Sequence, residues 1–277
     1  MEEKAPLVSV ILTCYNQEAY IGEAIDSVLR QTYDHWECMI VNDGSCDGSE
    51  QVIMDYAGRD SRLVYISQEN QGVVAARNRG IRQSKGKYIL PLDGDDVIEP
   101  EYLALAVEVM ERQNDVAIVC CDVEMFGKEQ GPLVLQECNL HNILLYGCCV
   151  SSSMFRRSGF DHVGGFKEEM AKGWEDWEFF ISLLETEGRA YKLNKSLFRY
   201  RIIENSRDRK IDEKVRVELL SKIVRLHPYL YYKEYGSLWQ ELKFLKRMPG
   251  FSLFWKFWVL VYKIRHHGKM PDFTFRS

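Results

Sequence analysis

The stretch Tyr88-Ile89-Leu90-Pro91-Leu92-Asp93-Gly94-Asp95-Asp96 joins a short apolar run directly to three carboxylates. The run has the length and composition of a buried strand, so the carboxylates fall at its C-terminal end. Carboxylates this close repel one another, and each is costly to desolvate without a partner. A hard divalent cation with oxygen ligands offsets both costs and can also hold phosphate. The first hypothesis is therefore a metal site that binds a phosphorylated ligand.

Apolar runs and helical periods alternate on both sides of this stretch. Short apolar runs predict strands, and apolar residues at helical spacing predict helices between them. We expect strands at 7–12, 38–41, 63–66, 88–92 and 116–121, and helices at 21–29, 73–83, 102–112 and around 52–56. This β-α-β-α order predicts an α/β fold with a mostly parallel sheet covered by helices on both faces.

Polar residues follow several of these strands at the point where each strand ends. Ligands of such sheets bind at the carboxyl ends of the strands, where 13–16, Asp43 and 93–96 would share one edge. Asp43 taken alone could simply stabilise the turn at 42–45, but the shared edge favours ligand contact. A nucleoside diphosphate suits such an edge, with a metal bridging the carboxylates to its phosphates. Neither GxGxxG nor GxxxxGK[ST] is present, so metal and side chains must hold the phosphates.

Composition excludes several classes of protein. The 277 residues carry a net charge of −5, which provides no general attraction to nucleic acid, so we expect no nucleic-acid partner. Eight cysteines, some adjacent inside apolar runs, indicate small buried hydrophobes in a reducing cytoplasm instead of a disulfide framework. No signal-peptide pattern opens the chain and no apolar run reaches ~18 residues. We therefore expect a cytoplasmic protein.

A second acidic pair lies in Trp174-Glu175-Asp176-Trp177, where helical spacing of the following apolar residues places Asp176 in the first turn of a helix. Two interpretations stay open. An acidic residue there is stabilised by the helix dipole, by about 0.3 to 1 kcal/mol. Alternatively, Asp176 is a general base, and the faces of Trp174 and Trp177 form a platform for a sugar ring.

Six elements in order resemble family-2 inverting glycosyltransferases of the GT-A fold. DxD alone occurs by chance in many chains, but the six with fitting spacing over residues 6 to 207 form a strong signal. They are VSVILTCYN (8–16), VNDGS (41–45), AARNRG (75–80), LDGDD (92–96), VGGF (163–166) and Glu175-Asp176. The resemblance implies a Rossmann-like sheet of the GT-A type and a nucleotide-sugar donor.

The resemblance also implies roles for individual residues. On the nucleotide side, Asp43 would bind the uracil or equivalent base, Asp93 would lie near the ribose, and Arg77 would supply a cation, unless Arg77 is merely a solvated helix residue. The pocket itself would be lined by Thr13, Tyr15 and Asn16. Asp95 would be the main protein ligand of Mn²⁺ or Mg²⁺ on the diphosphate.

The acceptor would be a saccharide or a lipid-linked saccharide in the synthesis of a cell-surface polysaccharide or glycolipid. Asp176 would deprotonate its hydroxyl, and the metal would stabilise the leaving diphosphate in a single inverting displacement. The acceptor side would be formed by Trp174, Glu175, Trp177 and Asp96, although Asp96 could instead be structural.

One position departs from the family pattern. Many relatives have a histidine in a Tyr-Arg-x-His-x-x-Ser segment that can reach the metal, and here Ile203 stands in its place. Isoleucine cannot coordinate a metal. Glu204 or water could substitute for the histidine, and Arg201 or Arg207 could neutralise the diphosphate.

Beyond residue 210 the character of the chain changes. We expect a glycosyltransferase domain at 1–210 and a helical C-terminal extension at 211–277. The segment 251–265 is dense in aromatic and aliphatic residues with interspersed Lys and Arg, yet it is too short to span a bilayer. It would pack on the catalytic domain or on a second subunit in a homodimer. Alternatively, it would lie peripherally on the inner face of the cell membrane.

Two other function classes would place different demands on the sequence. A sugar-1-phosphate nucleotidyltransferase would need a Gly-rich basic loop near the N-terminus, and residues 13–17 offer none. A non-catalytic nucleotide-sugar-binding module is compatible with Ile203, but the presence of Asp43, Asp93, Asp95 and Asp176 argues against it. The sugar and the acceptor depend on the region 126–172, where we expect an acceptor-side strand at 148–153.

Overall fold

The computed structural model describes residues 5–186, 188–204 and 211–235. The chain divides into two compact units, Met1–Lys222 and Ile223–Ser277. The domain boundary expected at residue 210 falls among the undescribed residues 205–210 and stays a prediction. The aromatic segment 251–265 and Arg207 also lie outside the described residues.

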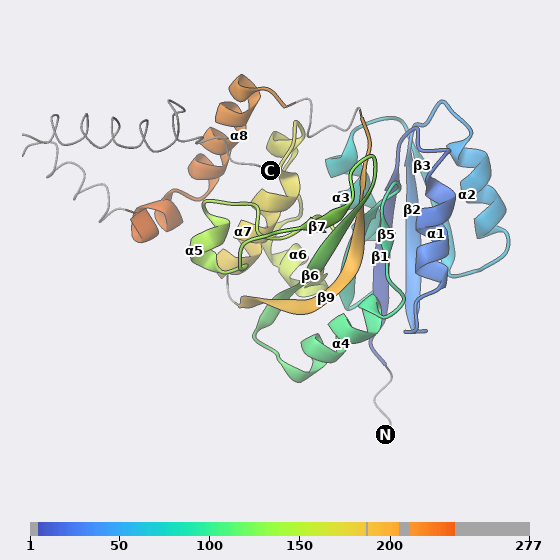
Figure 1. Cartoon of the computed structure of the whole chain (residues 1–277), viewed down its shortest axis with the longest axis horizontal. Helices are drawn as coiled ribbons and strands as arrows, with labels where there is room; N and C mark the ends of the chain where they lie inside the picture. The colour runs from blue at the N-terminus through green and yellow to red at the C-terminus, as the bar shows by residue number, and fades with distance from the viewer. Residues whose placement is uncertain (1–4, 187, 205–210, 236–277) are drawn as a thin grey trace, which may run out of the picture. The chain divides into compact units, whose positions relative to one another are not determined.

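Four parallel strands form from apolar runs predicted in the first half of the chain. They are β1 (Val8–Cys14), β2 (Trp36–Asp43), β3 (Leu63–Gln68) and β4 (Tyr88–Asp93) (Figure 1). Thr13 pairs with Asp93, and Asp43 pairs with Gln68, in the register of the sheet. These four residues therefore end neighbouring strands at one edge of the sheet, which we call the rim.

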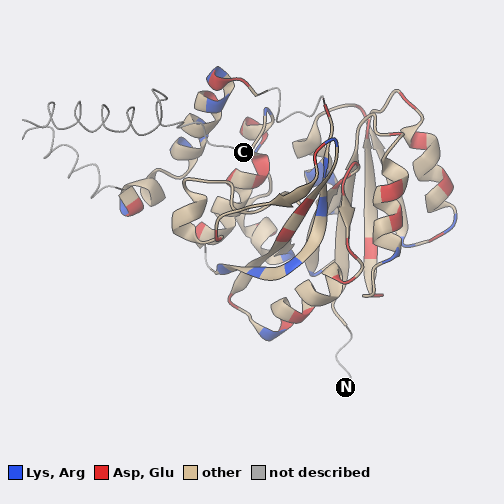
Figure 2. Ribbon diagram, in the orientation of Figure 1, with Lys and Arg blue, Asp and Glu red and all other residues tan. Residues whose placement is uncertain are grey.

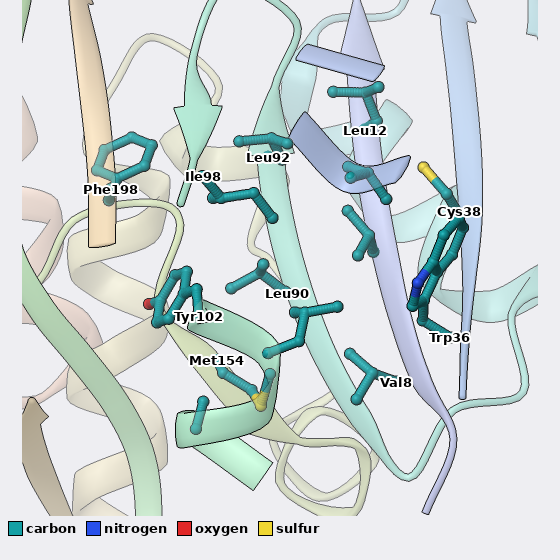
Figure 3. Close-up of a cluster of buried hydrophobic side chains, with 14 of the residues drawn as sticks. Val8, Leu12, Trp36, Cys38, Leu90, Leu92, Ile98, Tyr102, Met154 and Phe198 are labelled. Atoms are coloured by element: carbon teal, nitrogen blue, oxygen red, sulfur yellow. The ribbon is translucent and has the colours of Figure 1, made fainter. Parts of the chain in front are cut away.

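The four predicted helices of this half are confirmed as α1 (Ile21–Leu29), α2 (Ser49–Ala57), α3 (Val73–Gln83) and α4 (Tyr102–Arg112). Side chains alternate between the two faces of a strand, and Leu12 and Leu90 share a buried cluster with Tyr102 (Figure 3). Helix α3 packs against the other face. There a Cβ on Gly80 would lie 2.6 Å from Ile11 Cγ2, so the absence of a side chain permits the close approach.

The remaining strands are β5 (Val97–Ile98), β6 (Val116–Gly127), β7 (Gly131–Leu133), β8 (Met154–Arg156) and β9 (Arg189–Ile202). Within the described residues the sheet order is β3-β2-β1-β4-β8-β6-β9-β5, with β7 beside β6. Pairing along β6 and β9 is parallel, whereas the short strands β5, β7 and β8 run antiparallel to their neighbours. The predicted α/β fold with a mostly parallel sheet is confirmed.

The strand expected at 148–153 is wrong, because these residues form turns and the strand begins at Met154. The physical reason is local hydrogen bonding. The backbone N–H of Ser153 donates to Val150 O at 3.1 Å, and its hydroxyl donates to the same oxygen at 2.8 Å. Serine side chains that bond nearby backbone in this way favour turns over a strand ladder.

Four helices and a 3₁₀ turn complete the described chain: α5 (Leu140–Ile143), α6 (Arg157–Val163), η1 (Glu168–Met170), α7 (Glu175–Thr186) and α8 (Glu213–Leu226). Aromatic rings fasten α7 to the sheet, with Phe179 centred 4.9 Å from Phe155 of β8 and stacked 4.2 Å from Phe166. Asp176 is the second residue of α7, as the helical spacing predicts. Within the described residues, no helix has the length and apolarity needed to cross a membrane.

Candidate active site

Buried charge concentrates at the predicted motifs. Charged residues are spread over the described helices and strands (Figure 2). Among the described Asp, Glu, Lys and Arg residues, the buried side chains are those of Asp43, Arg77, Asp96, Glu175 and Glu178. Because an unpaired buried charge is strongly unfavourable, each of these groups must be paired with an opposite charge, hydrogen-bonded or neutral. Four of the five belong to motifs predicted from the sequence.

Arg77 of α3 joins the two acidic motifs. Its guanidinium Nη2 donates to both carboxylate oxygens of Asp93, at 2.8 and 3.0 Å, and Nη1 donates to Glu175 Oε1 at 2.9 Å. Burial opposes the charge, but Asp93, Glu175 and Asp176 raise the pKa of Arg77 further, so it is held as a cation. With 1% exposure, Arg77 is no solvated helix residue. It brings the end of β4 and the first turn of α7 together.

The neighbouring Asn78 fixes a second motif. Its side-chain amide donates to Phe166 O at 2.9 Å and accepts from Phe166 N at 3.0 Å. Gly164 and Gly165 precede Phe166 in left-handed conformations, with φ of 82° and 86°. A Cβ on Gly165 would lie 2.7 Å from Asn78 Oδ1, so glycine permits this close contact. The glycine pair thus forms a turn, and α3 holds it beside α7.

The Asp43 carboxylate accepts hydrogen bonds from the residues that directly precede α3. Its Oδ1 accepts from Gln68 Nε2 at 2.6 Å and from Gln71 N at 2.9 Å, and its Oδ2 accepts from Gly72 N at 2.8 Å. An ionised carboxylate offers about four acceptor positions, so these three donors leave capacity for one more on Oδ2. The carboxylate is thereby oriented before any ligand arrives.

Thr13, near the end of β1, contacts the end of β4, and Asn16, after β1, contacts the residues that follow β2. The Thr13 hydroxyl donates to Asp93 Oδ1 at 3.1 Å. Asn16, at φ 52°, accepts from Cys46 N at 2.7 Å and donates its own N–H to Ser45 Oγ at 3.0 Å. Tyr15 is 49% exposed beside them. Asn16 also lines a cleft of about 510 Å³ with Gln17, Glu18, Ala19, Tyr20 and Asp47.

Asp95 and Asp96 differ sharply in environment. Asp95 is partly exposed, and burial followed by repulsion from Asp93 raises its pKa to about 6. Asp96 is 1% exposed and accepts from Arg201 N at 2.8 Å, while Arg201 Nε donates to Asp95 O at 2.7 Å. Arg201 therefore connects β9 to residues 94–96, which we call the acidic loop. Asp95 is the carboxylate left available for a cation.

The side chains expected on the acceptor side divide into exposed and buried ones. Trp174 is partly exposed and adopts φ 59°, with its ring centred 5.2 Å from that of Trp177. Trp177 is 9% exposed and its indole Nε1 donates to Ile143 O at 2.5 Å. Glu175 is fully buried in its pair with Arg77. The contacts of Glu175 and Asp96 indicate structural roles, and their acceptor-side assignment stays a prediction.

Asp176 is partly exposed at the start of α7, where its Oδ1 accepts from Trp177 N at 2.8 Å. Ile203 follows β9 without a metal-binding group, and Glu204 pairs with Lys128 at 2.7 Å in an exposed ion pair. Gln68, Asn78 and the backbone contacts of Arg201 were not predicted. Asn78 stands inside a quoted motif and could have been suspected, whereas nothing in the local sequence marks Gln68.

Known proteins resemble this chain in sequence. Residues 9–164 match the family model for glycosyl transferase family 2. The chain is 31% identical over 212 residues to the putative teichuronic acid biosynthesis glycosyltransferase TuaG of Bacillus subtilis, covering 73% of this chain and 81% of TuaG. It is 33% identical over 216 residues to the uncharacterized glycosyltransferase EpsJ of the same organism. That match covers 73% of this chain but 62% of EpsJ.

Solved structures show the same fold. Staphylococcus aureus TarS 1–349 in complex with UDP-GlcNAc matches with a TM-score of 0.68 and 22% identity, over 81% of this chain and 66% of that one. The mannosyltransferase PcManGT of Pyrobaculum calidifontis, in complex with GDP-Man and Mn²⁺, matches with a TM-score of 0.64 and 20% identity, over 84% and 70%. These likenesses confirm the predicted GT-A architecture. The family match over residues 9–164, together with the identity to TuaG, shows that the chain belongs to glycosyl transferase family 2.

Proposed function

We propose that this glycosyltransferase transfers a sugar from a nucleoside-diphosphate sugar, a UDP-sugar in the first instance, to a hydroxyl acceptor with inversion at the anomeric carbon. The observation that carries the proposal is the double ion pair of Arg77. Because one buried guanidinium binds both Asp93 and Glu175, the strand end that would receive the donor lies beside the helix that carries Asp176. The donor and Asp176 could therefore take part in the same displacement reaction.

The nucleotide would bind along the rim. Asp43 retains one acceptor position, which suits the imide N–H of a uracil ring. Thr13 and Asp93 are hydrogen-bonded to each other and lie between the base site and the acidic loop. Tyr15 and Asn16 would complete the pocket. Since Arg77 is already paired with two carboxylates, its contribution to nucleotide binding would be to orient Asp93.

A divalent cation, Mn²⁺ or Mg²⁺, fits the environment of Asp95. The raised pKa of Asp95 reflects burial and the nearby Asp93, and a bound cation would reverse both effects. Within the described residues, no group of three or more His, Cys, Asp or Glu side chains could hold a metal. The other ligands would therefore be phosphate oxygens and water, as is common for Mg²⁺. Such a cation stabilises the charge that develops on the leaving diphosphate.

Asp176 would accept the proton of the acceptor hydroxyl while that oxygen bonds to the anomeric carbon. General-base catalysis of this kind contributes roughly 10²- to 10⁴-fold in rate. The partly exposed Trp174 next to it offers an aromatic face for the apolar side of a sugar ring. An attack from the face opposite the diphosphate inverts the anomeric configuration in one step.

The relatives suggest the biological setting. TuaG is named for teichuronic acid biosynthesis, and the fold neighbours bind UDP-GlcNAc or GDP-Man. We therefore assign the chain to cell-surface polysaccharide or glycolipid synthesis, with a saccharide or lipid-linked saccharide acceptor. A cytoplasmic location at the inner face of the membrane and a homodimer belong to the same proposal. The segment 251–265, which would make the membrane contact, lies outside the described residues.

The experiment that tests this function is nucleotide release from a panel of UDP- and GDP-sugars with Mn²⁺, each assayed with and without EDTA. Slow donor hydrolysis should release UDP from at least one UDP-sugar in a metal-dependent manner, even without the acceptor. Asp176→Asn protein serves as the matched control and should release far less. Tight donor binding with no release from any donor would favour a nucleotide-sugar-binding module instead.

A further inference from the structure

A cluster of thiols lies apart from the carboxylates described above. The Sγ atoms of Cys138 and Cys149 are 2.7 Å apart, although the two residues are separated by eleven positions in the chain. This distance exceeds the ~2.05 Å of a disulfide bond but is too short for ordinary contact between two sulfur atoms. Both thiols are free, and they are 7% and 9% exposed.

A third thiol, that of Cys120, belongs to the same cluster. Cys120 of β6 forms a side-chain hydrogen bond with Cys149, and this bond, followed by the positive charge of Lys192, lowers the pKa of Cys120. The same bond, together with that from Cys138, raises the pKa of Cys149. Hydrogen bonds therefore link three thiols in one cluster. Within the described residues no metal-binding group is found, so the cluster is not a metal site.

The loop between the two cysteines supports the candidate base. It contains α5, whose Ile143 carbonyl accepts the indole N–H of Trp177 at 2.5 Å. Trp177 directly follows Asp176, and its own backbone N–H donates to the Asp176 carboxylate at 2.8 Å. A covalent link between residues 138 and 149 would restrain the segment on which Trp177 rests.

We propose that Cys138 and Cys149 form a reversible disulfide that restrains the α5 loop and slows sugar transfer. The link to transfer rests on the function proposed above, whereas formation of the bond does not. The oxidant is a small-molecule disulfide. One protein thiolate attacks a sulfur of the reagent, which gives a mixed disulfide and releases one reagent thiol. The second protein thiolate then displaces the other reagent thiol. Two protein S–H bonds are lost, one S–S bond forms, and the reagent carries away two electrons and two protons as two thiols.

Such a bond is compatible with a reducing cytoplasm, where disulfides are transient and act in redox sensing. The thiols are already adjacent, so the bond can form with little movement of the backbone. The disulfide would restrain the acceptor side, because the α5 loop is hydrogen-bonded to Trp177 of α7. The hydrogen bonds that orient Asp43 come from residues outside this loop. Donor binding should therefore be unchanged by oxidation.

Peptide mapping tests the bond itself. The full chain, in a Cys46→Ser background that removes the exposed thiol, is treated with oxidised glutathione and then alkylated. No Lys or Arg lies between positions 129 and 155, so trypsin leaves Cys138, Cys148 and Cys149 on one peptide ending at Arg156. Further cleavage after Tyr146 by chymotrypsin separates Cys138 from the other two. The two fragments should stay joined until dithiothreitol is added, and fragments that separate without reductant would overturn the proposal.

Matched variants identify the partner cysteine. Cys148→Ser should keep the fragments joined, whereas Cys149→Ser should release them. The opposite result would overturn the assignment of the bond to Cys149. Transfer is then measured on the oxidised protein with an acceptor found by screening, or as donor hydrolysis. The rate should fall several-fold, recover with dithiothreitol, and be insensitive to oxidation in Cys149→Ser. A mapped bond with an unchanged rate would overturn the regulatory role alone, and an inactive reduced protein would instead count against the proposed function.

Discussion

Two regions of the molecule meet at Arg77, and they are built in different ways. Residues 5–98, the strand region, contain four parallel strands joined by helices, followed by the short strand β5. The carboxylates of Asp43 and Asp93 in this region accept several hydrogen bonds each. Residues 131–186, the loop-and-helix region, contain two strands of three residues each, β7 and β8, and rely on aromatic packing around α7. The strand region has its geometry fixed by the sheet register, whereas the loop-and-helix region is positioned by contacts with α3 and by ring packing of α7 on β8. This difference teaches that the helix carrying Asp176, the proposed base, is positioned in part by α3 of the strand region, where we propose that the donor binds.

The sharpest way to separate the two regions is Asp176→Asn. We expect turnover to fall by roughly 10²- to 10⁴-fold, because the base is lost while the fold keeps an isosteric side chain. Binding of the nucleotide sugar, measured by calorimetry with Mn²⁺, should stay close to wild type. Asp161→Asn, an exposed change on α6, is the matched control and should leave both quantities unchanged. Wild-type turnover in Asp176→Asn would rule out its role as base.

Arg77→Met breaks the link between the regions. Removing the guanidinium leaves the buried Glu175 carboxylate and the partly buried Asp93 without their cation, so the free energy of unfolding should fall by about 3 to 5 kcal/mol. Urea denaturation measures this loss. Arg79→Met changes the same residue type at an exposed position of the same helix and should cost little. Equal stability of the two variants would contradict the account of Arg77 as the buried link.

Asp95→Ala tests the strand region alone. Removing the one available carboxylate of the acidic loop should weaken metal-dependent donor binding by about 1 to 3 kcal/mol, the range of a lost hydrogen bond or ligand to a charged group. Calorimetry with Mn²⁺ and with EDTA separates the metal-dependent part. Asp55→Ala, exposed on α2, should retain the wild-type dependence. Donor binding that is equally metal-dependent in both variants would move the metal away from Asp95.

Asn78→Ala should destabilise the loop-and-helix region, with a smaller effect than the substitutions above. Phe166 loses two backbone hydrogen bonds, and buried backbone groups left unsatisfied cost about 1 to 3 kcal/mol in stability. Because the Gly164-Gly165 turn lies on the α7 side, the KM for the acceptor should rise more than the KM for the donor. Asn114→Ala, in an exposed turn, is the control. A larger effect on donor KM than on acceptor KM would contradict this division of the molecule.

The same comparison explains what could be predicted from the sequence. In the strand region, local patterns decide the structure: apolar runs such as 88–92 form strands, and their ends bring Thr13, Asp43 and Asp93 to one edge by sheet geometry. The position of Asp176 in the first turn of a helix was also readable from the spacing of apolar residues. The family resemblance then added roles that spacing alone does not provide.

The rest depended on contacts between residues far apart in the chain. The pairing of Arg77 with Glu175 spans 98 positions, and that of Asn78 with Phe166 spans 88. No local sequence pattern indicates that these residues form pairs. The strand expected at 148–153 failed because Ser153 bonds to Val150 locally, a choice that the apolar and β-branched neighbours obscure. The proximity of Cys138 and Cys149 could not be predicted either, because no local sequence pattern marks two residues eleven positions apart as neighbours.

The most direct test of the central claim is a crystal structure of Asp176→Asn protein with an intact nucleotide sugar and Mn²⁺. The account predicts a metal ion within about 2.0 to 2.6 Å of an Asp95 carboxylate oxygen and of the diphosphate. It also predicts that the anomeric carbon of the donor faces residue 176 on the side opposite the leaving group. A metal bound away from Asp95, or a sugar turned away from α7, would contradict the claim that Arg77 assembles donor site and base into one centre.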